Sequence, residues 1–274
     1  MPRLHLFEIE DQAWLPAYIR DSITDFLRYA VLRFDIYKGF SQRLINAIDR
    51  SKSQRAVDLC SGGGGPWPKL ILQLVEVRNG PKPFSVKLTD FYPNVPAMRE
   101  AAGCVQPGVI DFCDQSVSAL SVPPDLTGFR TLFSSFHHFR PDDARAIIAD
   151  AVLQKQGIAI AESTQRHPLL IAYMFLTPAL VLLTSPFQKP FRWSRLFWTY
   201  VIPVVPLAVM FDGIVSCLRT YTPQELMALV RGIPNYESFD WDAGVEPIGR
   251  LPVGVTYLIG VPRLDDITSA RRLE

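Results

Sequence analysis

The segment from Arg55 to Val77 constrains the fold more than any other part of this 274-residue chain. A short apolar run at 55–60 leads into four consecutive glycines at 62–65, and an apolar helical stretch follows at 70–77. A glycine turn between a strand and a helix leaves free backbone N–H groups at the helix start, and a ligand can approach them closely. The pattern therefore predicts a strand–turn–helix unit with a binding site at the turn.

The alternation of short apolar runs with helical stretches continues along the chain. Further strands are expected at 84–89, 109–112, 131–134, 158–161 and 256–260, and helices at 95–102 and 141–153. Strands that alternate with helices predict a parallel sheet covered by helices on both faces. Later in the chain, Thr222, Pro223 and Glu225 form a capping-box pattern that predicts a helix start ahead of two C-terminal strands.

Residues 1–50 precede the first strand and have a helical pattern. Apolar side chains recur at spacings of three and four from Ile19 to Phe34, and Gly39 is expected to end this helix. A second helix is expected at 41–49. Helices in this position can pack on the edge of the domain, and the helical pattern alone assigns them no further role.

Composition excludes several classes of protein. A hydrophobic content of 48% excludes intrinsic disorder, and 28 basic against 27 acidic residues give no global field for nucleic acid. The four cysteines form no CxxC pair, so we expect no metal site and a reducing, cytoplasmic setting. The first ten residues include charged side chains and do not resemble a secretory signal.

Residues 166–218 depart from this ordinary composition. The mean hydropathy of +0.12 is high for a chain with 20% charged residues, and two uncharged runs, 168–188 and 196–211, account for most of the excess. The charged residues between them are Lys189, Arg192 and Arg195. Three interpretations stay open: a spanning helix pair, a hairpin in one leaflet, and a buried cap or oligomer contact. Internal prolines and the cationic tip argue against spanning.

The glycine turn resembles the first motif of class I S-adenosylmethionine-dependent methyltransferases, a hydrophobic residue followed by Asp/Glu-x-Gly-x-Gly-x-Gly. Here Asp58 is the acid, Cys60 stands at the first glycine position, and Gly62 and Gly64 match the other two. The resemblance implies that S-adenosylmethionine binds at Asp58, Cys60, Ser61, Gly62 and Gly64. It also implies that a small residue such as cysteine is tolerated at the first position.

Three later segments resemble further motifs of that family, in the family's order. Leu88-Thr89-Asp90 resembles the end of the second strand, which implies that Asp90 binds the ribose hydroxyls and that Phe91 packs on adenine. The segment 111–114 resembles the third-strand motif, which implies that Asp114, or alternatively Asp111, meets the adenine amino group. The segment 129–139 resembles the fourth-strand motif and contains Ser135, a further candidate cofactor contact.

His137 and His138 end the fourth-strand motif and are the candidate catalytic residues. An unperturbed imidazole titrates near pH 6.5, which suits removal of a proton at neutral pH. The alternative is that both rings only pack between strand and helix. Methyl transfer needs such a base only when the acceptor must lose a proton.

These observations predict an α/β fold with a doubly wound, mostly parallel seven-stranded sheet, an N-terminal helical lid and an apolar helical insertion. The expected divisions are 1–50 (lid), 51–165 (cofactor-binding core), 166–218 (insertion) and 219–274 (end of the core), with a surface loop at 77–83 and a frayed charged tail from Asp265 to Glu274.

The predicted activity is methyl transfer from S-adenosylmethionine to an oxygen, nitrogen or carbon atom of a small, apolar acceptor. No nucleic-acid partner is expected, and peripheral membrane contact through 168–211 is one alternative for a protein otherwise expected in the cytoplasm. The rival functions are a nicotinamide-dependent oxidoreductase and a membrane-associated protein that binds the cofactor without transferring a methyl group.

Overall fold

The computed structural model describes residues 1–78, 84–249 and 251–263. Within them, seven strands form one sheet in the order β3-β2-β1-β4-β5-β7-β6. The strands are β1 (Arg55–Asp58), β2 (Ser85–Leu88), β3 (Ile110–Phe112), β4 (Phe129–Phe133), β5 (Ile158–Glu162), β6 (Phe239–Pro247) and β7 (Gly254–Pro262). β1 to β5 run parallel, and β7 pairs antiparallel with both β5 and β6. The predicted mostly parallel seven-stranded sheet is confirmed.

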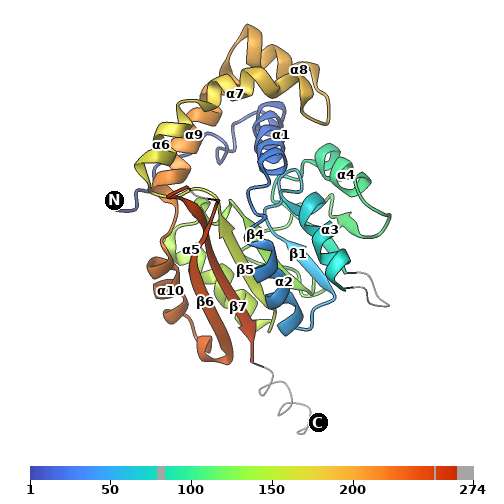
Figure 1. The fold of residues 1–274 in the computed structure, drawn as a ribbon, viewed down its shortest axis with the longest axis vertical. Coiled ribbons are helices and arrows are strands. Elements are labelled where there is room, and N and C mark those ends of the chain that lie inside the picture. Colours follow the sequence, from blue (N-terminus) through green and yellow to red (C-terminus); the bar gives the residue numbers. More distant parts are fainter. Residues whose placement is uncertain (79–83, 250, 264–274) are drawn as a thin grey trace.

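Helices cover both faces of the sheet (Figure 1). One face carries α2 (Ser41–Arg50), α3 (Trp67–Arg78) and α4 (Val95–Gly103), and the other carries α5 (Pro141–Leu153) and α10 (Pro223–Arg231). Successive side chains of a strand point to opposite faces, so Ala56 packs in the first core and its neighbour Val57 in the second.

Local sequence explains where several helices begin. Thr222 and Glu225 form the predicted capping box of α10, because each side chain bonds the backbone N–H of the other residue. The Asn94 side chain accepts from Ala97 N at the start of α4. The end predicted at Gly39 is wrong: α1 (Ala17–Phe34) stops at Asp35, which itself adopts a left-handed conformation with φ 51°. Aspartate tolerates that region better than most residues.

The apolar insertion forms an arm, which we define as residues 168–219. Its helices arch away from the sheet toward α1 (Figure 1). They are α6 (Pro168–Met174), α7 (Thr177–Thr184), η2 (Ser185–Phe187), α8 (Trp193–Leu196), η3 (Phe197–Val201) and α9 (Val204–Arg219). Two further short turns, η1 (Phe136–His138) and η4 (Tyr236–Ser238), lie outside the arm. A third apolar core joins α7 and α9 to α1, so the arm and the N-terminal helix form one packed unit.

A buried ion cluster also ties the arm to α1. The side chains of Asp25 and Arg195 are both fully buried, and Arg195 Nη1 lies 2.8 Å from Asp25 Oδ2. Arg192 Nε donates to the same oxygen at 2.8 Å. Arg195 also donates to the carbonyls of Ser185 and Gln188, which satisfies the rest of its guanidinium.

No single helix of the described chain is long and apolar enough to cross a membrane. Two pairs of consecutive helices reach that length and apolarity only when the two helices are taken together, and each pair is bent at its junction. These are 168–174 with 177–187, bent by 44°, and 193–201 with 204–219, bent by 81°. The loop predicted at 77–83 falls mainly outside the described residues, as does the tail from Asp265.

We predict that Asp25→Ala lowers the free energy of unfolding by about 3–5 kcal/mol, because it leaves the Arg195 guanidinium buried without a counter-charge. Asp21→Ala is the matched control: its ion pair with Arg192 is partly exposed and is worth about 0–1 kcal/mol. Urea denaturation measures both. Equal losses for the two variants would contradict the role given to Asp25.

Candidate functional site

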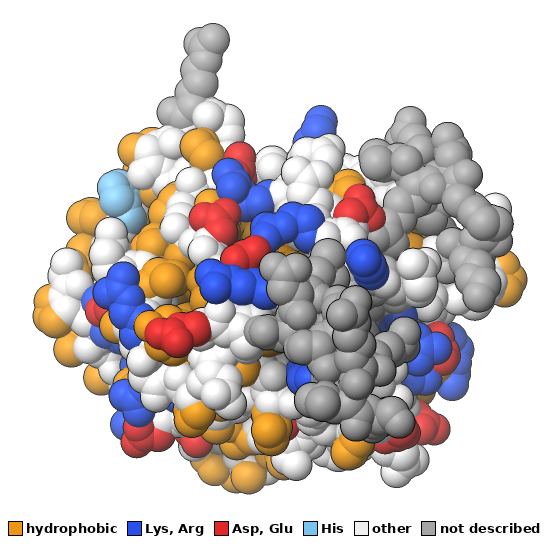
Figure 2. Space-filling view, turned by 90° about the horizontal axis from the view of Figure 1, so that it is seen from below, with side chains coloured by type: hydrophobic (Ala, Val, Ile, Leu, Met, Phe, Trp, Pro, Cys, Tyr) orange, Lys and Arg blue, Asp and Glu red, His pale blue; other side chains and the backbone are white. Residues whose placement is uncertain are grey.

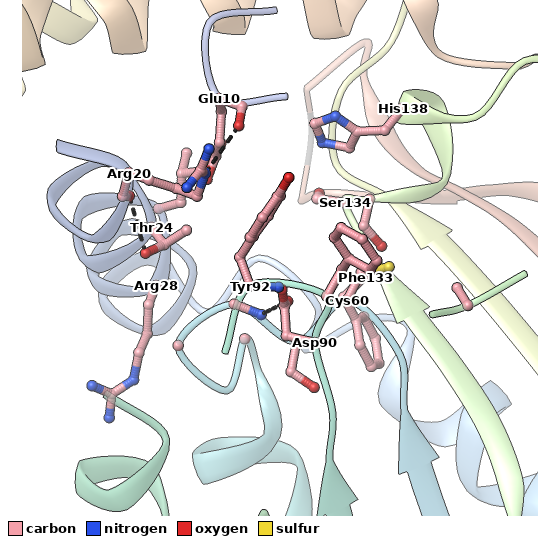
Figure 3. Close-up of a pocket in the computed structure, with 18 of the residues that line it drawn as sticks. Glu10, Arg20, Thr24, Arg28, Cys60, Asp90, Tyr92, Phe133, Ser134 and His138 are labelled. Atoms are coloured by element: carbon pink, nitrogen blue, oxygen red, sulfur yellow. Dashed lines mark hydrogen bonds between the residues drawn. The ribbon is translucent and has the colours of Figure 1, made fainter. Parts of the chain in front are cut away.

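A cavity of about 430 Å³ lies at the carboxyl ends of β1, β2 and β4. The N-terminal segment and α1 face these strand ends across the cavity (Figure 3). Much of its wall is apolar, with Leu27, Val31, Ala119, Phe133 and Phe139 among the lining residues. Ligand sites of open α/β sheets occur at this edge, and the volume falls within the range of pockets that bury small molecules.

The glycine turn forms the floor of the cavity. Cys60 has a φ of 56° and Gly62 a φ of 54°, both in the left-handed region. The resemblance implied that cysteine is tolerated at this position because it is small, but the backbone also favours glycine there, and a side chain costs about 1–2 kcal/mol. A Cβ on Gly62 would lie at an ordinary contact distance of 3.6 Å from Thr24 of α1, so the positive φ rather than a lack of space favours glycine there.

Asp90 follows β2 and links the turn to this strand. Its Oδ2 accepts from Gly62 N at 2.7 Å, and its Oδ1 accepts from Tyr92 N at 2.8 Å. Burial raises the pKa of Asp90, and the two backbone donors oppose this shift. A carboxylate offers about four acceptor positions, so two remain for hydroxyl donors from the cavity that Asp90 lines.

Two aromatic rings stand beside Asp90. Phe91 and Tyr92 are 53% and 43% exposed and meet edge to face with centroids 4.9 Å apart. The Arg20 guanidinium lies 4.2 Å from the centre of the Tyr92 ring, and Arg20 also donates to the carbonyl of Glu10. Tyr92 projects into the cavity between α1 and the strand ends (Figure 3), so it offers a flat face for a ring-containing ligand.

Asp58 lies behind the turn, outside the cavity lining. Its Oδ1 accepts from the Thr131 hydroxyl at 2.6 Å. Burial raises the pKa of Asp58 to about 7. Its backbone carbonyl also accepts from the hydroxyls of Ser61 and Thr89, so the observed contacts of Asp58 hold the turn against β2 and β4.

His138 faces the cavity above the turn (Figure 3), and its ring contacts two carboxylates. Its Nδ1 is 2.9 Å from Glu8 Oε2 and 2.7 Å from Asp11 Oδ1. Because ionised carboxylates only accept, Nδ1 carries a proton, and Nε2 is the nitrogen left for the cavity. Burial lowers the pKa of His138, but the two acids outweigh burial and raise it well above the usual value.

Arg219 of α9 completes this cluster from the other side. Its Nη1 lies 2.9 Å from Glu8 Oε2 and 2.7 Å from Asp11 Oδ2. Burial of Glu8 opposes its ionisation, but the imidazoles of His138 and His137 and the charge of Arg219 hold its pKa below the ordinary value. Two carboxylates and two cations therefore form one cluster at the rim of the cavity.

His137 points away from the cavity into the same buried region. Its Nδ1 is 2.6 Å from Glu162 Oε2, and its Nε2 is 3.8 Å from Glu8 Oε1. The ligand atoms of Glu8, His137 and His138 lie within 4.8 Å of one another, a spacing that a metal ion can bridge. The protonated His138 ring and the Arg219 guanidinium already lie against the carboxylates of Glu8 and Asp11 and balance their charge.

Asp212 holds the N-terminal segment in place over the site. Its two carboxylate oxygens accept from Ile9 N at 2.7 Å and Glu10 N at 3.0 Å. Glu10 lines the cavity, and burial raises its pKa to about 8. The segment before α1 thus contributes Glu10 and Asp11 to the wall of the cavity, as a lid would.

The structure brings most of the sequence-predicted site residues together. Seven line the cavity: Cys60, Ser61, Gly62, Asp90, Phe91, Ser135 and His138. Asp58, Gly64, Asp114 and His137 do not line it, and Asp114 is exposed. Among the described residues, the arm contributes none to the lining. The cofactor contacts predicted for all of these residues stay predictions, and those of Asp58, Gly64 and Asp114 would have to be made from outside the cavity lining.

Comparison with known proteins was made by sequence and by structure. No protein-family model and no curated protein sequence matches the chain. A structure from Nostoc punctiforme PCC 73102, whose proposed activity is O-methyl transfer, matches with a TM-score of 0.51 and 11% identity over 94% of this chain and 64% of that one. An O-methyltransferase from neocarzinostatin biosynthesis matches with a TM-score of 0.50 and 13% identity over 90% of this chain and 58% of that one.

The chain has the class I methyltransferase fold. It spans less than two thirds of the length of either neighbour. The neocarzinostatin enzyme was solved with S-adenosylmethionine and 2-hydroxy-5-methyl naphthoic acid. The residues fit S-adenosylmethionine by their chemistry, because Asp90 keeps acceptor positions for hydroxyls and the turn lacks side chains at Gly62, Gly63 and Gly65.

The sequence did not point to Asp212 and Arg219, the residues that α9 contributes next to the cavity. Asp212 and Arg219 lie seven positions apart, and Ser216 between them donates to Glu8 Oε1 at 3.0 Å. This spacing places all three on one face of the helix. One signal was available in the sequence: Asp212 is the first acidic residue after 168–211, a segment without acids. Asp212 begins the polar face of α9 that continues to Arg219.

Gly64 has a packing role that Gly65 lacks. Both have positive φ, 98° and 48°, but a Cβ on Gly64 would lie 2.8 Å from Ala101 of α4, whereas a Cβ on Gly65 meets nothing within 4 Å. We predict that Gly65→Ala costs about 1–2 kcal/mol from backbone strain, and that Gly64→Ala costs about 1–3 kcal/mol more from overpacking. Thermal and urea unfolding of both variants tests this, and equal costs would refute the packing role.

Proposed function

We propose that this protein transfers a methyl group from S-adenosylmethionine to a small, apolar acceptor that loses a proton in the reaction. The observation that carries the proposal is the meeting of Asp90, the glycine turn and His138 at one cavity. Asp90 and the turn would hold the cofactor, and the apolar wall would hold the acceptor. When bound, the cofactor supplies a methyl group on a positively charged sulfur.

His138 would act as the general base. Its Nδ1–H stays fixed on Glu8 and Asp11, which orients the ring and leaves Nε2 for the acceptor's proton. The two carboxylates also stabilise the imidazolium that forms when that proton arrives. The N-terminal segment, held by Asp212, would exclude water, and positioning of the two reactants would supply much of the remaining rate.

Cofactor binding provides the first test. We expect S-adenosylhomocysteine to give binding heat in calorimetric titration and NADH to give none. Asp90→Asn should weaken binding of S-adenosylhomocysteine about 10- to 100-fold, because one hydrogen bond to a charged acceptor contributes about 1.5–3 kcal/mol.

Asp142→Asn, on the exposed first turn of α5, is the control and should bind like the wild type. Asp114→Asn decides the adenine contact that the sequence predicts. Heat with NADH alone would favour the oxidoreductase alternative, and an unaffected Asp90→Asn would remove the basis of the proposal.

The base assignment predicts a pH dependence. Only neutral His138 can accept a proton, and its pKa lies well above 6.5. Activity should therefore fall as the pH drops through a value above 6.5. Asp11→Asn removes one acid that raises this pKa, so the acid limb should move to lower pH. The rate at which S-adenosylhomocysteine forms with hydroxylated apolar acceptors, measured across a range of pH for both proteins, gives the position of the acid limb.

His138→Gln should lose about 10²–10⁴-fold in kcat while it still binds S-adenosylhomocysteine. His167→Gln, at the start of α6, is the matched control and should keep its activity. An acid limb at or below pH 6.5, or one unmoved in Asp11→Asn, contradicts a base at His138. If the protein binds S-adenosylhomocysteine but no acceptor leads to its formation from S-adenosylmethionine, the non-catalytic alternative gains support.

A further inference from the structure

The outer side of the arm exposes an unusual amount of apolar surface. Its inner side packs on α1 through the third core, so the outer side is not needed for that packing. The exposed large apolar residues of the arm are Leu169, Tyr173, Phe175, Leu176, Leu182, Leu183, Phe187, Phe191, Trp193, Phe197, Tyr200, Val201, Ile202 and Leu207. Extended apolar surface of this kind marks interaction sites.

The tip of the arm, residues 187–193, arranges its side chains in two alternating rows. Phe187, Phe191 and Trp193 point outward with exposed fractions of 72%, 53% and 78%, and Lys189 between them is also exposed. The even-numbered Gln188 and Arg192 point inward, where Arg192 pairs with Asp25. Three aromatic rings and one cation therefore form an outward row, which we call the tip row.

The cations of the arm are divided between the two sides. The sequence groups three near the tip, but Arg195 is fully buried on Asp25 and Arg192 is 18% exposed on Asp21 and Asp25. Lys189 is the cation that stays on the outside. The segment 168–211 contains no acidic residue, so nothing within it repels an anionic surface.

A cationic groove lies directly behind the tip row. Its volume is about 370 Å³, and its lining includes Phe187 and Lys189 of the tip row with Arg28 and Arg33 of α1. The remaining lining residues are Tyr29, Leu32, Glu100 and Cys104. Arg28 is 7% exposed, and its Nε has no hydrogen-bond partner in the described part of the chain. A buried, unsatisfied guanidinium N–H is costly, and an anionic group in the groove would satisfy it.

The opposite end of the molecule differs from the arm. Viewed from below, it shows acidic and basic side chains intermingled with apolar ones (Figure 2). Ion pairs such as Arg43–Asp242 and Arg50–Asp240 belong to the sheet and α2. The tip row differs in that its exposed aromatic rings stand beside Lys189 in a segment without acidic residues, although Glu100 of α4 lines the groove behind it.

We propose that the tip row docks on a membrane surface that contains anionic phospholipid, with a lipid phosphate in the groove lined by Arg28, Arg33 and Lys189. Aromatic rings beside lysine suit the boundary between headgroups and acyl chains. The helices next to the tip are bent and too short to span singly, which suits shallow insertion. Arg28 lines both this groove and the main cavity, so a lipid in the groove lies beside the proposed reaction site. The docking itself does not depend on methyl transfer.

Co-sedimentation of the full chain with vesicles tests the proposal. One set contains phosphatidylcholine alone, and the other contains equal parts of phosphatidylcholine and phosphatidylglycerol. We expect binding to the mixed vesicles that weakens with added salt. The triple variant Phe187→Ser, Phe191→Ser, Trp193→Ser should lose at least about tenfold in partition, because each ring buries apolar area in the interface.

Two matched controls keep the test specific. The triple variant Leu72→Ser, Leu153→Ser, Leu251→Ser removes equally exposed apolar side chains from the catalytic core and should bind like the wild type. Lys189→Ala and Arg33→Ala should each lose roughly fivefold on mixed vesicles, since a cation near an anionic surface contributes about 1 kcal/mol. Arg231→Ala on α10 should lose nothing. Unchanged unfolding transitions verify that each variant is folded.

Several outcomes would overturn the proposal. They are absence of binding to mixed vesicles, equal binding to both vesicle types, and unaltered binding of the tip-row variant. A dimer in solution that the tip-row variant abolishes, without vesicle binding, would assign the surface to a second copy of this chain. None of these outcomes bears on the binding of S-adenosylhomocysteine, so the proposed methyl transfer stands or falls separately.

Discussion

The N-terminal segment stays over the cavity because two carboxylates and two cations meet beneath it. Glu8 and Asp11 come from that segment, Arg219 from α9 and His138 from η1, the short turn after β4. Removing four charges from water costs several kcal/mol for each ion, which their mutual attraction roughly repays. The main effect of the cluster is therefore positional: it fixes the N-terminal segment, the last turns of α9 and His138 relative to one another.

The stabilisation that this cluster provides depends on pH through the charge of His138. Its pKa in the folded protein lies above the usual value, so the stabilisation it contributes is complete below about pH 6.5 and is lost as the pH rises through the folded pKa. Neutral His138 can still donate Nδ1–H to the acids, but it no longer contributes a charge. Removal of the proton that would make His138 an active base therefore also weakens the attraction that holds the N-terminal segment.

Asp90 was located by its resemblance to a family motif, whereas local patterns in the sequence were enough to predict the sheet and the glycine turn. Those features arise from periodicity and from the rule that parallel strands carry their ligands at one edge. The cluster at Glu8 and Arg219 was not predictable in the same way, because its members lie about two hundred positions apart and only tertiary packing brings them together. Asp58 and Gly64 show a subtler limit: the motif located them correctly at the turn, while their observed contacts are with the protein interior.

The arm shows that the mean hydropathy of a segment does not reveal whether that segment lines a binding cavity. A cap over the acceptor was one of three interpretations of its apolar residues, yet no described residue of the arm lines the cavity, and α1 and the N-terminal segment face the strand ends instead. The arm acts on that wall indirectly. Because Arg195 is fully buried on Asp25, the arm cannot move relative to α1 without exposing or isolating a charge, at a cost of about 3–5 kcal/mol. Since Arg20, Thr24 and Arg28 of the same helix line the cavity, the position of the arm and the shape of the cavity are set together.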